Sequence, residues 1–319
     1  MDINILISNL TNPTLLFFIL GILSFVVKSD LEIPESSSKF ISLYLLFSIG
    51  FKGGQELSHS EFTSEIFLTL LFAIVMSAIV PLYSFFILKK RLNVYDAGAV
   101  AAAYGSVSAV TFVAATSFLE NEQLHFGGHM VAAMALMESP AIIIGVYLIM
   151  RYQTEGERQD FKKIIHHSLT NGSVLMIVGS LVIGIVADSK QAEGIKPFTT
   201  DIFKGFLAVF LLEMGIVTAR RFKAFRNYGK YVTAFAILMP AFNGVLVAAL
   251  SGLITQDVGN RFLLAILGAS ASYIAVPAAM RLAAPKAEPG LYIPMALGLT
   301  FPFNITVGIP LYYWIIGLT

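Results

Sequence analysis

Two short stretches of small and hydroxyl-bearing residues, in otherwise apolar surroundings, are the strongest candidates for a binding site. Residues 104–108 (YGSVS) and 268–272 (GASAS) each lie in the middle of a long apolar segment. Glycine and serine both weaken the hydrogen-bond ladder of a helix, so we expect each helix to break there. The half-helix after a break begins with free backbone N–H groups and a partial positive charge, which favour an anion. Neither stretch contains Lys or Arg, so backbone dipoles and serine hydroxyls would hold the anion.

Glu138 is the residue with the highest free-energy cost of burial in a membrane, because it lies in the middle of an apolar segment. A carboxylate at membrane depth costs several kcal/mol unless it is paired, protonated or bound to a cation. Pro140 frees a backbone carbonyl that could join it, and residues 300–304 (TFPFN) form a second oxygen-rich segment with a proline. These oxygens suit a hard monovalent cation such as Na+, which would offset the charge of an anion and supply a driving gradient. The alternatives are a proton carried by Glu138, or a neutral Glu138 hydrogen-bonded to a neighbouring helix.

Other polar residues give weaker indications. Lys52 either guides an anion inward or snorkels to the membrane interface, and we favour snorkelling. Asp96 and Asp257 precede their helices and are predicted as N-caps, while Glu213 faces either a lumen or a neighbouring helix. The five histidines fall in or near loops without metal-ligand spacing. There is no cysteine, which excludes thiolate metal sites, disulfides and cysteine nucleophiles.

The composition places the chain in the membrane class. Of its 319 residues, 56% are hydrophobic and only 13% are charged, with a mean hydropathy of +0.77. A soluble domain carries about 25% charged residues, so this chain has too little polar surface for water. The net charge of +1 gives no field that would attract nucleic acid. The first apolar run lacks a basic start and a small-residue cleavage site, so we expect a retained helix there.

Ten segments are predicted to cross the bilayer, which takes roughly 20 mostly apolar residues each. The second segment has the shortest apolar run, and it reaches the length of a span only together with its flanking residues. The ten segments are 3–27, 40–51, 66–88, 97–119, 130–150, 168–187, 205–219, 231–256, 262–280 and 289–319.

The basic residues between these segments predict the orientation. Most Lys and Arg fall in the loops after segments 1, 3, 5, 7 and 9. The positive-inside rule places these loops in the cytoplasm and both termini outside it, in the plasma (inner) membrane. The opposite side has only four basic residues: Lys52, Lys190, Lys196 and Arg261. Lys204 lies within segment 7 and is not counted on either side.

The two halves of the chain are similar at an offset of about 163–165 residues. Residues 101–120 align without gaps on 264–283, and LFSIG (46–50) aligns on LLEMG (211–215). Five spans per half is an odd number, so the halves 1–160 and 161–319 would be inverted relative to each other, as in secondary transporters. The two half-helices after the breaks would then face one point from opposite sides. Small residues also permit close helix packing, but their matched positions favour a site.

The segments AAAYGSVSAVTFVAATSF, MVAAMALMESPAIIIG, GASASYIAVPAAMRLA and ALGLTFPFNITVGIPLYY resemble those of the cyanobacterial-type sodium-dependent bicarbonate transporters. Weaker similarity in NPTLLFFILG and LLFSIGFKGG extends the resemblance to nearly the whole chain. The resemblance implies an all-α fold of five plus five helices, with helices 4 and 9 crossing at their breaks. It also implies a core of helices 3–5 and 8–10, a gate of helices 1, 2, 6 and 7, and Na+-coupled bicarbonate uptake.

The same resemblance implies the site residues and the partners. For the anion they are Gly105, Ser106, Val107, Ser108, Ala269, Ser270 and Ser272. For sodium they are Glu138, Thr300 and Asn304. The family is implied to be homotrimeric, and often regulated by a small PII-like nucleotide-binding protein at the cytoplasmic face, where residues 152–167 form the only sizeable loop.

Three functional readings follow from these features. The first is a Na+/bicarbonate symporter without a further cofactor. The second keeps the architecture but carries a small organic carboxylate, or uses H+ as the coupling ion. The third is a channel or an intramembrane hydrolase, although no histidine lies in the middle of a span to serve such an enzyme. The sequence contains no glycine loop with a following Lys for nucleotide phosphates, which favours secondary transport over ATP-driven transport.

Overall fold

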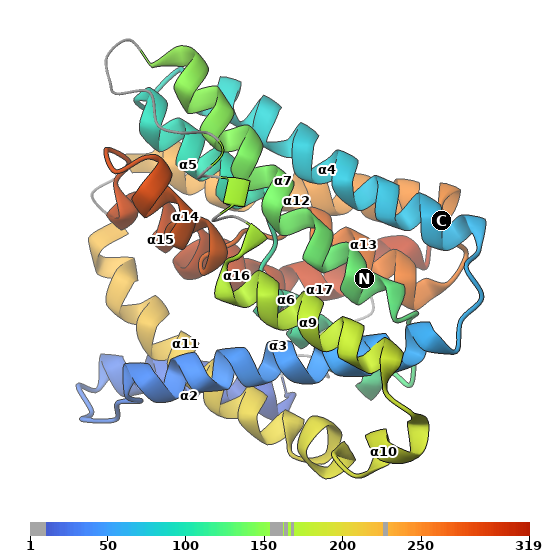
Figure 1. The fold of residues 1–319 in the computed structure, drawn as a ribbon. Helices are drawn as coiled ribbons and strands as arrows, with labels where there is room; N and C mark the ends of the chain where they lie inside the picture. The colour runs from blue at the N-terminus through green and yellow to red at the C-terminus, as the bar shows by residue number, and fades with distance from the viewer. Residues whose placement is uncertain (1–10, 154–161, 163–164, 167–168, 226–228) are drawn as a thin grey trace.

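The computed structural model describes residues 11–153, 162, 165–166, 169–225 and 229–319, and within these it contains helices and turns but no β-strand (Figure 1). Up to residue 153 the helices are α2 (Pro13–Val26), α3 (Glu35–Ser58), α4 (Ser64–Leu88), α5 (Val94–Gly105), α6 (Ala109–Asn121) and α7 (His129–Tyr152). The later α-helices are α9 (Gly172–Val186), α10 (Ser189–Glu193), α11 (Phe203–Phe225), α12 (Gly229–Leu250), α13 (Val258–Gly268), α14 (Ala275–Ala283), α15 (Pro289–Met295), α16 (Phe301–Phe303) and α17 (Ile309–Ile316). Shorter π- or 3-10 turns are η1 (Pro197–Asp201), η3 (Ser251–Leu253), η4 (Ala296–Thr300) and η5 (Asn304–Gly308).

Six helical segments are long and apolar enough to span a bilayer, so the prediction of an all-α, multi-pass membrane protein is confirmed. They are Ser64–Leu88, Val94–Asn121, His129–Tyr152, Pro197–Arg220, Gly229–Leu253 and Pro289–Ile316. Three shorter apolar helices accompany them: Pro13–Val26, Gly172–Val186 and Val258–Gly268. The first predicted span began at residue 3, and its residues 3–10 lie outside the described part of the chain.

The segment that carries the first break lies inside the protein. Of the most apolar 18 residues of Val94–Asn121, 89% are buried inside the protein, compared with 33% for those of α4. Helices α5 and α7 pack against α4, and α12 packs against α13 and α17. In Figure 1, α4, α7 and α12 form the upper part of the view, and α14, α16 and α17 lie between them and α3.

A second group of helices, in the lower part of Figure 1, is held by two glycine crossings. Helix α2 packs along α11, and α3 packs along α9. A Cβ atom added to Gly21 or Gly215 would overlap a backbone carbonyl oxygen of the other helix, and the same is true of Gly54 and Gly184. Only glycine lets two helix backbones approach this closely, so each crossing requires it.

We expect Gly21→Leu to lower the thermal stability of the detergent-solubilised protein, because the new side chain must push α2 away from α11. Overpacking of this kind costs about 1–3 kcal/mol, which predicts a fall in Tm of several degrees. Gly179→Leu is the matched control, since a Cβ at Gly179 meets no atom of another segment within 4 Å. Equal Tm values for the two variants would contradict the assigned crossing.

The predicted N-caps are half confirmed. Asp257 caps α13, because its side chain accepts a hydrogen bond from the backbone N–H of Asn260 at 2.7 Å. The prediction for Asp96 is wrong: Asn93 caps α5, three residues earlier, where the backbone is still extended. Asp96 instead accepts a hydrogen bond from the N–H of Glu288 at 2.8 Å, and so ties α5 to the turn before α15.

Candidate functional site

The first predicted break is present. Helix α5 ends at Gly105, and the chain is extended at Ser106 (φ −88°, ψ 178°) and Ser108 (φ −98°, ψ 105°) before α6 begins. The Ser108 hydroxyl caps α6 by accepting a hydrogen bond from the N–H of Thr111 at 3.1 Å. Gly105 lies against the ring of Pro81 in α4, where a Cβ atom would not fit.

The second predicted break is also present, and it is longer. Helix α13 ends at Gly268, and α14 begins only at Ala275. The Ser272 hydroxyl accepts a hydrogen bond from the N–H of Val276 at 3.4 Å, near the start of α14. Each break is therefore followed by a half-helix with a serine hydroxyl at its first turn.

The two breaks cross each other, as the resemblance implied. The N–H of Ser272 donates to the carbonyl oxygen of Ala103 at 2.8 Å, and the N–H of Ser108 donates to the Ser270 hydroxyl at 3.2 Å. These bonds satisfy backbone and side-chain groups that the breaks release from the helical ladder. Segments more than 160 residues apart in the sequence thus form one junction.

A small pocket, with a cavity volume of about 10 Å³, lies at this crossing. The first break contributes Val107, Ser108 and Ala109, and the second contributes the run from Ser272 to Ala275. Glu138 of α7 lines the same pocket. The remaining wall comes from the second group of helices, through Leu46 of α3 and Ser173 of α9. The pocket therefore lies between the two broken helices and the helices that close over them.

The first turns of α6 and α14 are the features of this pocket that favour an anion. Within the described structure, the backbone N–H groups of Ala109 and Ala275 have no hydrogen-bond partner, and both residues line the pocket. Each helix N-terminus carries about half a positive charge. None of the described residues that line the pocket is Lys or Arg, so these dipoles are its source of positive potential.

Glu138 adds a buried carboxyl group to the same pocket. Its side chain is 4% exposed, and one carboxylate oxygen, Oε2, has no hydrogen-bond partner among the described residues. A buried carboxylate in this state suits a bound cation, and the hydroxyls of Ser108 and Ser272 line the same pocket. All of these donors are oxygen atoms, the donor type that a hard cation such as Na+ prefers.

Thr300, a predicted sodium ligand, does not line this pocket. Its hydroxyl donates to the carbonyl oxygen of Ala236 at 2.7 Å and is bonded to the Tyr104 hydroxyl at 2.7 Å. That carbonyl is free to accept because Pro240, four residues later in α12, has no N–H to offer it. The hydroxyl of Thr300 thus joins α12 to the first broken helix.

Asn304, the other predicted sodium ligand, supports the crossing from behind. Its amide donates to the carbonyl oxygen of Ala269 at 2.8 Å, and its side-chain oxygen accepts from the Tyr312 hydroxyl at 3.2 Å. Among the predicted sodium ligands, only Glu138 reaches the pocket in this conformation.

The predicted anion residues divide in the same way. Val107, Ser108 and Ser272 line the pocket, whereas Gly105, Ser106, Ala269 and Ser270 lie behind it at the crossing. The sequence analysis missed six other residues that line the pocket: Leu46, Ala109, Ser173, Tyr273, Ile274 and Ala275. Ala109 and the run 273–275 directly follow the two predicted stretches, so longer stretches would have included them. Leu46 and Ser173 come from helices in which the sequence indicated no site.

Glu213, left undecided by the sequence, is partly buried on α11 and does not line the pocket. The pocket at the crossing, which combines a carboxyl group and hydroxyls with an apolar wall, remains the candidate site.

Comparison with known proteins identifies the family of the chain. No curated relative matches the chain. Residues 13–317 match the family model of the Na+-dependent bicarbonate transporter superfamily, which covers the described helices almost from end to end. Membership of this family makes the protein a transporter rather than an enzyme. The chain therefore belongs to the Na+-dependent bicarbonate transporter superfamily.

Proposed function

We propose that this protein is a symporter in which one pocket binds Na+ and bicarbonate side by side. Glu138 and nearby hydroxyl oxygens bind Na+, and the N–H groups of Ala109 and Ala275 bind bicarbonate. The observation that carries this proposal is the position of the Glu138 carboxylate in the same pocket as two helix N-termini. Thr300 and Asn304 hold the crossing in this conformation, and Glu138 is the primary cation ligand.

The charges explain why the two ions depend on each other. Bicarbonate and the Glu138 carboxylate are both negative, and at about 5 Å with an effective dielectric constant of 20 they repel by about 3 kcal/mol. This repulsion weakens bicarbonate binding by roughly 100-fold when the cation site is empty. A Na+ ion between them replaces the repulsion with attraction. The two ions therefore bind together, which is the requirement for symport.

The proposed architecture is ten spans in two inverted halves, 1–160 and 161–319. The glycine crossings support it. Gly21 of α2, which contacts α11, aligns in the repeat with Gly184 of α9, which contacts α3. One glycine of each crossing thus stands at a matching position of the repeat, whereas the partner glycines, Gly215 and Gly54, do not align with each other. The boundary between the halves falls at residues 160 and 161, which lie outside the described residues.

Alternating access follows from the grouping of the helices. We assign α4–α7 and α12–α17 to a core that carries the crossing, and α2, α3, α9 and α11 to a gate. Leu46 and Ser173 of the gate close the pocket on one side. Movement of the core relative to the gate would open the pocket to one side of the membrane at a time.

We propose that both termini lie outside the cytoplasm, in a plasma (inner) membrane. Lys89 lies over the ring of Tyr152 with its ammonium group 3.7 Å from the ring centre, and Lys286 lies over the ring of Tyr95 at 5.3 Å. These lysines follow α4 and α14, where the positive-inside rule expects the cytoplasmic face.

A homotrimer and a PII-like regulator at the cytoplasmic face remain predictions from the resemblance. Most of the loop 152–167, to which such a regulator would bind, lies outside the described residues. The mass of the detergent-solubilised protein, measured by light scattering, distinguishes a trimer from a monomer of 34.7 kDa.

The proposed function predicts that purified protein in proteoliposomes takes up labelled bicarbonate when Na+ is high outside. Uptake should fall to background when choline replaces Na+, because the Glu138 charge is then left without a cation. Uptake that is unchanged in choline but follows a proton gradient would favour H+ coupling instead. Unlabelled formate and acetate, added as competitors, test the alternative that a small organic carboxylate is the substrate, since its planar carboxylate fits the same N–H groups.

A further inference from the structure

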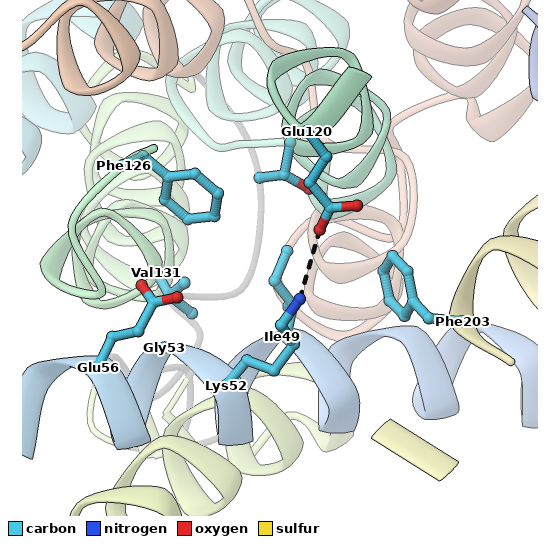
Figure 2. A pocket seen from close by; sticks show the side chains of 9 residues that line it. Ile49, Lys52, Gly53, Glu56, Glu120, Phe126, Val131 and Phe203 are labelled. Carbon is cyan, nitrogen blue, oxygen red and sulfur yellow. Dashed lines mark hydrogen bonds and ion pairs between the residues drawn. The ribbon is translucent and has the colours of Figure 1, made fainter. Parts of the chain in front are cut away.

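A second pocket lies near the ends of α3 and α6 and the start of α11, away from the crossing. We call it the outer pocket; its lining includes Ile49, Lys52, Glu56, Thr116, Glu120 and Phe203. Figure 2 shows Lys52 of α3 reaching across this pocket to Glu120, with Phe126 and Phe203 on either side. It joins a core helix, α6, to two gate helices, α3 and α11.

Two ammonium groups share the carboxylate of Glu120: that of Lys52, which lines the pocket, and that of Lys204, which directly follows the lining residue Phe203. The Nζ atom of Lys52 lies 3.3 Å from Oε1 of Glu120, and the Nζ atom of Lys204 lies 3.3 Å from Oε2. The three side chains are 36%, 51% and 37% exposed for Lys52, Lys204 and Glu120. Ion pairs with this much exposure to water contribute little stability, so they exchange readily with other ions. The sequence analysis favoured snorkelling for Lys52; in the structure its ammonium group pairs with Glu120 across the helix seam.

The chemistry of the pair matches that of the transported anion. A glutamate carboxylate and bicarbonate both present a planar group of two oxygens on one carbon, with one negative charge. The two ammonium groups that contact the Glu120 oxygens can contact the bicarbonate oxygens in the same way. Glu120 thus occupies the place of a small planar anion in this conformation.

The outer pocket also lies on the same helix seam as the crossing pocket. On α3, Leu46 lines the crossing pocket, and Lys52 lines the outer one. On α6, Ala109 lines the crossing pocket, and Thr116 lines the outer one. Seven residues of helix correspond to about 10 Å, so an anion at the outer pocket is two helical turns from the proposed binding site.

We propose that Lys52 and Lys204 form a recruiting site that captures the transported anion from the outside, and that the anion displaces Glu120 from the two ammonium groups. This inference rests on the proposed function and on the orientation proposed above. Displacement breaks both ion pairs between core and gate, so capture of the anion also releases the contact that closes the seam at this end.

Variants that remove positive or negative charge distinguish a recruiting site from ion pairs that only hold the core and the gate together. Uptake into proteoliposomes is measured against external bicarbonate at saturating Na+ and at two ionic strengths. The double variant K52Q/K204Q should raise the KM for bicarbonate about three- to tenfold and weaken its dependence on ionic strength, because the local positive potential is lost. E120Q should lower the KM, because the resident competitor is removed. If the ion pairs only hold the core and the gate together, both variants should shift the KM in the same direction. That result would contradict the recruiting site.

Two further variants control the experiment. Lys196→Gln removes an exposed lysine outside the outer pocket and should leave the KM unchanged. Lys52→Arg keeps the charge, so its KM should lie closer to that of the wild type than the KM of Lys52→Gln does, and the Tm of K52Q/K204Q shows whether that variant is folded. A wild-type protein without Na+-driven uptake would contradict the proposed function itself. If the wild type is active and K52Q/K204Q has the same KM for external bicarbonate, only the recruiting site is contradicted.

Discussion

Replacing Glu138 by glutamine is expected to raise the half-saturating Na+ concentration for bicarbonate uptake about 100-fold, and so to reduce uptake strongly at ordinary Na+ concentrations. Glutamine has the same shape but no charge, so the cation loses its one charged ligand in the crossing pocket. Loss of about 3 kcal/mol of cation binding corresponds to about a 100-fold weaker affinity for Na+. Initial uptake rates measured across a series of Na+ concentrations give this shift directly.

The expected loss is specific to the pocket. Glu193→Gln, on the exposed helix α10, removes the same charge far from the pocket and should leave the Na+ dependence intact. Glu138→Gln also removes the cost of burying a charge, so its thermal stability should be at least that of the wild type. An unchanged half-saturating Na+ concentration in Glu138→Gln would contradict the proposed cation site.

Ala109→Pro is expected to raise the KM for bicarbonate about 10- to 100-fold. Ala109 is the first residue of α6, a position where proline is well tolerated, and the preceding Ser108 is already extended. Proline removes the backbone N–H that we propose as an anion ligand, while the helix remains. A hydrogen bond to a charged group contributes about 1.5–3 kcal/mol, which gives the expected range. The KM is measured from initial uptake rates at saturating Na+.

Two variants show whether the missing N–H causes this effect. Ala109→Val adds similar bulk to the pocket but keeps the N–H, so it reports the steric contribution alone. Val94→Pro places proline at the first residue of α5, also after an extended cap residue, and tests tolerance of the fold. If Ala109→Val raises the KM as much as Ala109→Pro, then the N–H does not bind the anion.

Much of the architecture could be predicted from the sequence because its signals are local. Apolar runs long enough to cross a bilayer gave the all-helical membrane class. Glycine and serine in 104–108 and 268–272 gave the two breaks, because these residues weaken the helix wherever it is placed. The cost of a mid-span carboxylate drew attention to Glu138, and the structure places it in the crossing pocket.

The composition of the site could not be predicted, because it depends on contacts between distant segments. Thr300 carries oxygen in a proline-rich segment, which suggested a sodium ligand. Its hydroxyl is already bonded to Ala236 and Tyr104, and nothing in the local sequence indicates those partners. Ser173 and Leu46 line the pocket only because α9 and α3 close over the crossing.

Lys52 shows the same division for the outer pocket. Its position near the end of a span favoured an interface lysine, which is the common case. Its contact with Glu120 joins residues 68 positions apart, and it depends on how α3 lies against α6. No spacing in the sequence connects these two residues.

The two broken helices show which features follow from the sequence and which follow from the tertiary structure. The sequence by itself determined that the helices break and that the following half-helices begin with free N–H groups, since both follow from backbone chemistry within a few residues. Only the tertiary structure decided that the breaks cross, through the bonds from Ser272 to Ala103 and from Ser108 to Ser270. It also decided that Glu138 faces both helix N-termini. The reason is physical: a helix dipole is a local property of the chain, whereas a shared pocket requires separate segments to meet in space.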